Sequence, residues 1–187
     1  MTGEPDARVP GYLGRVLDGD GEPVGTCFQI EPGLLATAWH VLDDIHAGEE
    51  GEVVSVDPLA GGATRDATVV AIDPLADLAV LRTNDSLPIS IAGLSATDSV
   101  AMSAAVVVTG VSEVDDPGRS YRCLDAAGEW AGGTMIDDQI PYGHLESRAI
   151  VPGMSGAPVR AQQTISLSAS CRAATTRRTA GSSTPSG

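Results

Sequence analysis

The chain has 187 residues, 42% of them hydrophobic, which is enough to bury one sizeable core or two small ones. Its formal charge of −14 comes from 25 acidic residues against 11 arginines, with no lysine. Because such a surface repels phosphate groups, nucleic acid and anionic membranes are not expected as partners. Glycine and proline are frequent and aromatic residues are rare, a balance that favours an all-β chain of short strands and tight turns.

Six strands are predicted in the first 83 residues. Two short strands lie between Gly11 and Ile30, separated by the turn-forming GDGEP. A strand over Leu34–Ala38 then gives way to a short helical turn. Three further strands follow at spacings of about 8 to 12 residues, EVVSVDP, ATVVAID and LAVLRT. This rhythm is typical of a sandwich or a barrel, and no helix is long enough for a parallel crossover.

Residues 84–99 are rich in Asn, Asp, Ser, Pro and Gly and are predicted to be a connector. Strands resume over Ala104–Val111. Weaker strand signals follow around Tyr121–Cys123, Gly133–Ile136 and His144–Ile150. We therefore expect two β-subdomains, residues 1–83 and 100–159, divided by this connector.

Residues 160–187 differ in composition from the rest of the chain. They hold four arginines and no acidic residue, whereas the preceding 159 residues carry a net charge of −18. Ser, Thr and Ala dominate, as they do in disordered tails. We therefore expect this segment to be a disordered tail.

No metal site, cofactor or disulfide framework is expected. Cys27, Cys123 and Cys171 are an odd number without a Cys-x-x-Cys pair, and the three histidines are poorly spaced for a metal. The first residues are acidic and contain prolines, where a secretory signal needs basic and apolar residues. No apolar stretch approaches the roughly 18 to 20 residues of a membrane span. These features predict a soluble, cytoplasmic protein.

Three short elements could carry chemistry. LLATAWHVL places His40 at the end of an apolar strand, DPLADLAVL places Asp77 directly before another strand, and GMSGAP places Ser155 between glycines. Acyl transfer by serine needs a hydroxyl, an imidazole that takes its proton, and a carboxylate that orients the imidazole. The three elements supply one of each. The glycines let the backbone turn tightly, so that the N–H groups of Gly153 and Ser155 can point at a developing oxyanion.

Each element alone also has a plainer explanation. A lone histidine is usually a satisfied polar residue, an aspartate before an apolar strand is usually a cap, and a serine between glycines is usually part of a turn. The catalytic interpretation therefore depends on the order of the three elements and their apolar flanks. For the carboxylate, Asp73 is an alternative to Asp77.

In these elements the chain resembles the trypsin-like serine peptidases of the chymotrypsin fold, in particular compact bacterial members. The similarity covers roughly residues 11–159 and depends on GTCFQIEPGLLATAWHVL, DPLADLAVLR and GMSGAPV, in the order His, Asp, Ser. The resemblance implies two six-stranded β-barrels and catalytic roles for His40, Asp77 and Ser155. It also implies that the N–H groups of Gly153 and Ser155 are the oxyanion-hole donors.

The resemblance selects Asp77 over Asp73, because the acid of the family stands directly before Leu-Ala-Val. It implies a protein or peptide substrate. It also places Ala149, six residues before the nucleophile, at the base of the primary specificity pocket. The preferred substrate is therefore expected to present a small or apolar side chain to this pocket. Domains of this kind often form one module of a larger regulatory or defence protein, so association with such modules is expected.

The resemblance breaks after Val159. Family members continue through strands that close the second barrel, one of them carrying a Gly-apolar-Val-Ser segment. The second barrel is therefore expected to be incomplete at its C-terminal end. In a reading frame shifted by one base, Ser168–Arg172 permits Gly-Val-Val-Ser, and residues 174–187 permit Tyr-Asn-Ser-Ala-Asp-Gly-Trp-Leu-Leu-Asp-Thr-Val-Trp. We hypothesise a frame slip between Val159 and Ser168, which the gene sequence would test.

Two kinds of function are compatible with these features. The first is a serine endopeptidase domain that acts through an acyl-enzyme intermediate. The second is a non-catalytic β-barrel binding module, or an inactive fragment of such a peptidase, because the closing strands are missing. Labelling by an active-site serine probe would separate them.

Overall fold

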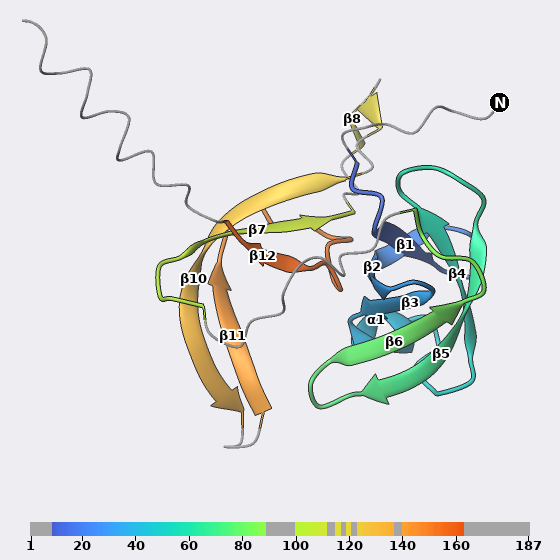
Figure 1. Cartoon of the computed structure of the whole chain (residues 1–187), viewed down its shortest axis with the longest axis horizontal. Helices are drawn as coiled ribbons and strands as arrows, with labels where there is room; N and C mark the ends of the chain where they lie inside the picture. Colours follow the sequence, from blue (N-terminus) through green and yellow to red (C-terminus); the bar gives the residue numbers. More distant parts are fainter. Residues whose placement is uncertain are drawn as a thin grey trace, which may run out of the picture.

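The computed structural model describes residues 9–88, 100–111, 115–116, 119–120, 123–136 and 140–162. Within these residues the chain forms strands, turns and one short helix, arranged as two antiparallel β-units (Figure 1). The predicted all-β class is confirmed. None of the helices in the described part is long and apolar enough to cross a membrane.

The first unit is a closed antiparallel barrel of six strands in the order β1-β2-β3-β6-β5-β4. Its strands are β1 (Leu13–Leu17), β2 (Pro23–Glu31), β3 (Leu34–Thr37), β4 (Val53–Pro58), β5 (Arg65–Asp73) and β6 (Leu78–Thr83). All six lie where the sequence predicts strands. The helical turn after β3 is the helix α1 (Trp39–Asp43).

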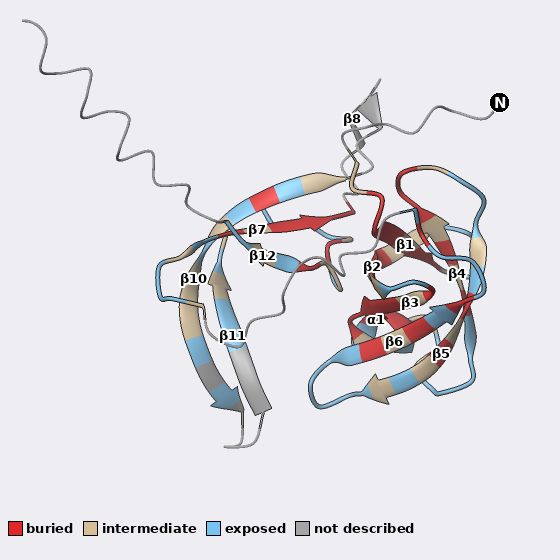
Figure 2. Ribbon diagram, in the orientation of Figure 1, coloured by how far each residue is buried: buried red, intermediate tan, exposed pale blue. Residues whose placement is uncertain are grey.

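The barrel interior holds the main hydrophobic core. Leu35, Val56 and Leu81 are 0% exposed, and Val69 is 1% exposed. Figure 2 shows that buried residues are concentrated in this unit, whereas the second unit is mostly intermediate or exposed. The barrel is therefore the rigid part on which a site can be built.

Replacing Leu35 by alanine is expected to lower the free energy of unfolding by about 2–5 kcal/mol, because it leaves a cavity in a packed interior. Leu75, which is 77% exposed, is the matched control, and Leu75→Ala is expected to change stability by less than about 0.5 kcal/mol. Urea denaturation followed by fluorescence measures both. Equal effects of the two changes would contradict the described core.

The second unit is a four-stranded antiparallel sheet in the order β11-β10-β7-β12. Its strands are β7 (Ala105–Gly110), β10 (Leu124–Ile136), β11 (Ile140–Glu146) and β12 (Val159–Ala161). A separate short pair is formed by β8 (Asp115–Asp116) and β9 (Arg119–Ser120). The described residues thus form one closed barrel and one incomplete sheet, as predicted.

Three predicted strands of the second unit have different limits. The strand predicted over Gly133–Ile136 is the end of β10, whose first part is rich in Ala, Gly and acidic residues with low strand propensity. That part is a strand because β7 pairs along one side of it. The strand predicted over His144–Ile150 starts earlier and stops at Glu146. Cys123 lies outside any strand, and residues 121–122 lie outside the described part.

The boundaries between units also differ in detail from the predicted ones. Leu87, at the start of the predicted connector, is buried, and its backbone N–H and C=O both bond to the Gln29 side chain of β2. Residues 84–88 therefore belong with the barrel, and residues 89–99 lie outside the described part. Strand β12 extends two residues beyond Val159, and residues 163–187 lie outside the described part.

A small apolar cluster joins the two units. It contains buried Tyr12, Leu13 and Leu59 from the barrel and buried Val111 from the end of β7. This contact fixes the end of β7 against the barrel, and the second sheet lies beside the barrel (Figure 1).

Candidate active site

Helix α1 presents His40 to solvent while its other side is anchored in the barrel. Val41 and Leu42 are buried in the main core, and the indole N–H of Trp39 donates to the carbonyl of Gly48 at 3.0 Å. Apolar residues on both sides of His40 thus hold the helix in place. The imidazole itself is 46% exposed, so it is accessible to a substrate.

The imidazole of His40 contacts the carboxylate of Asp77. Nδ1 of His40 lies 2.7 Å from Oδ2 of Asp77, and the backbone N–H of His40 donates to Oδ1 at 2.9 Å. One carboxylate therefore holds both the ring and the backbone of the same residue. This arrangement leaves Nε2 of the imidazole free of the pair, which is what a general base needs.

The turn between β5 and β6 directs Asp77 toward His40. Oδ1 of Asp73 accepts hydrogen bonds from the backbone N–H groups of Leu75 and Ala76, at 3.1 and 3.0 Å, and so stabilises the turn. Asp77 has a left-handed backbone with φ of 52°. The two competing carboxylates thus have different places, Asp73 in the turn and Asp77 on the imidazole.

Ser155 is carried by a tight turn in the segment between β11 and β12, which contacts both units. The preceding Met154 is 4% exposed and packs in the small core of the second sheet, with Val108 and Ala126. The Ser155 residue is exposed, and its carbonyl accepts a hydrogen bond from the backbone N–H of Thr26 on β2 at 2.8 Å. The Ser155 loop, residues 153–156, is therefore anchored on both units.

Gly156 brings the loop close to α1. Its φ is 81°, and a Cβ at this position would collide with Thr26 O and lie 2.9 Å from the backbone nitrogen of Ala38, two residues before His40. The structure thus joins His40 and Asp77 directly and packs the loop that carries Ser155 against the segment before His40. Only a glycine fits this approach. Within the described residues, the Ser155 hydroxyl forms no hydrogen bond to His40.

Replacing Gly156 by alanine is expected to destabilise the chain and displace Ser155. Gly21 is the control, because its φ of 84° is similar but its Cβ would meet nothing within 4 Å. Gly21→Ala should cost about 1–2 kcal/mol through backbone strain alone. Gly156→Ala should cost about 1–3 kcal/mol more through overlap. Denaturant unfolding measures the difference, and equal costs would mean that the loop does not pack as described.

The backbone around Gly153 is suited to bind an oxyanion. Gly153 has φ of 88°, and the neighbouring N–H of Met154 bonds within the turn to Val151 O at 3.3 Å. Within the described residues, the N–H groups of Gly153 and Ser155 donate to no protein acceptor. Among the described residues, both N–H groups are therefore free to donate to a ligand.

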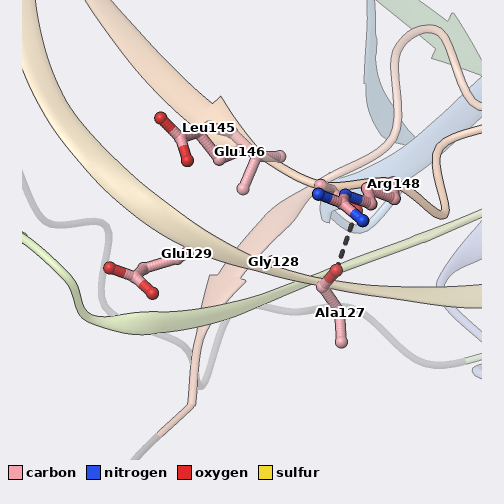
Figure 3. Close-up of a pocket in the computed structure, with 7 residues that line it drawn as sticks. Ala127, Gly128, Glu129, Leu145, Glu146 and Arg148 are labelled. Carbon is pink, nitrogen blue, oxygen red and sulfur yellow. Dashed lines mark hydrogen bonds between the residues drawn. The ribbon is translucent and has the colours of Figure 1, made fainter.

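Ala149 lies in the irregular segment after β11, where it is exposed and its N–H donates to Oγ of Ser147 at 3.2 Å. An open depression of about 590 Å³ lies nearby on β10 and β11 (Figure 3). It is lined by Ala127, Gly128, Glu129, Leu145, Glu146, Ser147 and Arg148. Neither His40, Asp77 nor Ser155 lines it, so we assign it no part in the site.

The described cysteines are not competing nucleophiles. Burial raises the pKa of Cys27 to about 12 and that of Cys123 to about 11. Both thiols therefore stay protonated at neutral pH, and a protonated thiol is a weak nucleophile.

Sequence reasoning missed Thr26, which bonds to the Ser155 loop through both its backbone and its side chain. The signal present in the sequence is one polar β-branched residue in the otherwise apolar strand VGTCF. That signal does not distinguish a loop contact from a surface threonine.

A closed antiparallel barrel that carries His40 and Asp77, joined to a second sheet that anchors Ser155, defines the double-barrel architecture of chymotrypsin-like proteins. Residues 25–164 match the family described as trypsin-like peptidase domain. The chain therefore belongs to the trypsin-like peptidase family, and its substrates are proteins or peptides. No curated protein matches the chain by sequence.

Two solved structures have a similar fold. The MamO protease domain from Magnetospirillum magneticum, in its apo form, is 20% identical with a TM-score of 0.59, over 83% of this chain and 80% of that chain. Deg5 is also 20% identical with a TM-score of 0.59, over 81% of this chain and 74% of that chain. At this identity the likeness shows a common fold.

Proposed function

We propose that the chain is a serine endopeptidase domain that hydrolyses peptide bonds through an acyl-enzyme intermediate. The observation that carries this proposal is the double hydrogen bond between His40 and Asp77, beside a loop that presents Ser155. An imidazole held by a carboxylate in this way is oriented to accept a proton from a serine hydroxyl.

In the proposed reaction, Oγ of Ser155 attacks the scissile carbonyl carbon while Nε2 of His40 takes its proton. The resulting oxyanion accepts hydrogen bonds from the N–H groups of Gly153 and Ser155. The C–N bond then breaks, and His40 returns the proton to the leaving amine. Water, deprotonated by the same imidazole, then attacks the acyl carbon. The bond from this carbon to Oγ of Ser155 breaks, and His40 returns the proton to Oγ. Asp77 stabilises the imidazolium throughout.

Ala149 is proposed to lie at the base of the primary specificity pocket. Since alanine has no charge to pair with Arg or Lys, substrates with a small or apolar side chain before the scissile bond should be cleaved fastest. A panel of peptides that differ only in this residue tests the preference. Faster cleavage after Arg or Lys would overturn it.

A fluorophosphonate probe tests the proposed function. The folded chain should be labelled at one site, and peptide mapping should place the label on Ser155. A urea-unfolded sample is the control and should not react, because a serine outside its site is not activated. A sample that is folded by circular dichroism but takes up no label would overturn the proposal.

The second candidate function, a non-catalytic binding module, is favoured by the open second sheet. Among the described residues, β11 and β12 are the edges of a four-stranded sheet, whereas the barrel of the first unit is closed. A folded chain that binds a peptide without labelling or cleavage would support this alternative.

A further inference from the structure

Thr26 lies on the outside of the barrel and is nevertheless completely buried. Its neighbour Cys27 belongs to the main core, so Thr26 faces the opposite way, since side chains alternate along a strand. Thr26 is 0% exposed. A Cβ on Gly110, at the end of β7, would lie 3.0 Å from its hydroxyl oxygen. The second unit therefore covers this side chain.

Every polar group of Thr26 has a partner. Its N–H donates to Ser155 O at 2.8 Å, and its carbonyl accepts from the hydroxyl of Thr37 at 2.8 Å. Its own hydroxyl donates to Gly153 O at 2.8 Å and accepts from the N–H of Val111 at 2.9 Å. Thr26 thus connects the Ser155 loop, the end of β7 and the end of β3.

The two loop carbonyls that Thr26 binds stand on either side of the nucleophile. The carbonyl of Gly153 belongs to the peptide plane before Met154, and the carbonyl of Ser155 belongs to the peptide plane after Ser155. Hydrogen bonds to both carbonyls therefore fix the two planes that flank these residues. Gly153 and Gly156 have φ of 88° and 81°, so the loop between them depends on external contacts to keep one shape. The N–H of Ser155 lies within this held segment.

The same residue relates the loop to the imidazole. Thr37, which bonds to the Thr26 carbonyl, is the last residue of β3 and stands three residues before His40. A short path of hydrogen bonds and backbone therefore runs from Ser155 through Thr26 to His40. Thr26 and Thr37, the middle members of this path, are buried in the barrel wall, where they have little freedom to shift.

We propose that Thr26 is a positioning residue, whose hydroxyl holds the loop 153–155 in the shape that aligns Ser155 and the two oxyanion donors. This inference rests on the proposed function. Loss of the hydroxyl leaves Gly153 O and the N–H of Val111 without a partner in a buried place. The loop then moves, although the barrel keeps its structure.

The test uses the full chain with three substitutions. Thr26→Val removes the hydroxyl at nearly constant volume, and Thr26→Ser retains it. Thr83→Val is the matched control, because Thr83 is 5% exposed and its hydroxyl donates to Asp85 O at 2.9 Å, at the end of β6. The Thr83→Val substitution removes a comparable buried hydroxyl that has no bond to the Ser155 loop.

Hydrogen exchange of the peptide 151–158 is the first measurement. The N–H groups of Met154 and Ala157 are hydrogen bonded inside this loop, so they report its opening. Thr26→Val should speed their exchange by at least about tenfold, with the strands of the barrel unchanged. Thr26→Ser and Thr83→Val should match the unsubstituted chain. No change in Thr26→Val, or the same change in Thr83→Val, would overturn the inference.

The rate of fluorophosphonate labelling is the second measurement. Thr26→Val should lower the rate by about 10- to 100-fold, because small displacements of a nucleophile are costly, and Thr26→Ser should restore it. Normal labelling of Thr26→Val would overturn the inference. If the unsubstituted chain does not label, the proposed function fails, while the exchange measurement still decides the role of Thr26.

A Thr26→Val chain that does not fold is replaced in both measurements by Thr26→Cys. A thiol is a weaker donor and acceptor than a hydroxyl. Exchange of the loop N–H groups in Thr26→Cys should therefore be faster than in Thr26→Ser, by up to about tenfold. Exchange equal to that of Thr26→Ser would overturn the inference.

Discussion

The Ser155→Ala chain is expected to take up no fluorophosphonate and to hydrolyse peptides about 10⁶-fold more slowly than the unsubstituted chain. The substitution removes the atom that would form the acyl-enzyme, and no neighbouring group replaces it. Because the Ser155 residue is exposed, its hydroxyl contributes little to folding, and stability should change by less than about 0.5 kcal/mol. The substitution should therefore abolish activity while the stability of the chain is retained.

Ser86→Ala is the matched control for this result. Ser86 is also exposed, and the hydrogen bond that it accepts from Arg65 involves its backbone carbonyl, which the substitution retains. The control should label and cleave normally. Labelling of Ser155→Ala at the unsubstituted rate would show that another residue is the nucleophile.

Asp77→Asn is expected to lower the rate of peptide hydrolysis by about 10⁴-fold. Asparagine accepts the left-handed φ of 52° as readily as aspartate does, so the turn should be kept. The amide can still accept the backbone N–H of His40 through its oxygen, but its NH₂ group then faces Nδ1 of the ring. That contact favours the tautomer with the proton on Nε2, which cannot act as a base.

Steady-state kinetics on a peptide substrate measures this effect, with Asp43→Asn as the control. Asp43 is an exposed acid on the same helix as His40, so its substitution removes an equal charge without touching the imidazole. The control should remain within about threefold of the unsubstituted chain, since exposed charges are well screened. A similar loss in both chains would mean that Asp77 acts through the general negative charge of the surface.

The first barrel was predictable because its strands have strong local signals. Alternating apolar residues such as those around Val54 and Val56, with tight turns between strands, mark each segment without tertiary information. Strand β10 was only partly predicted, because Ala126, Ala127 and Gly128 have no strand signal of their own. They form a strand because β7 offers partners along their whole length.

The candidate site also has features that the sequence predicted and features that only the structure shows. His40, Asp77 and Ser155 were selected from the order of three short elements, and the structure adds the 2.7 Å contact between the first two. The separate place of Asp73 in the turn could not be derived from spacing, because it depends on which N–H groups the folded turn presents. The same holds for Thr26, whose partners lie 85 and 127 residues away.

By itself, the amino-acid sequence determined the all-β class, the positions of the barrel strands and the identity of the three residues proposed for catalysis. These depend on composition, local periodicity and short motifs, all of which act over a few residues of chain. Tertiary structure alone decided that Asp77 reaches His40 across 37 residues and that Gly156 packs against the end of β3. The reason is that such distances are set by strand register and packing, which bring together groups that no local pattern relates.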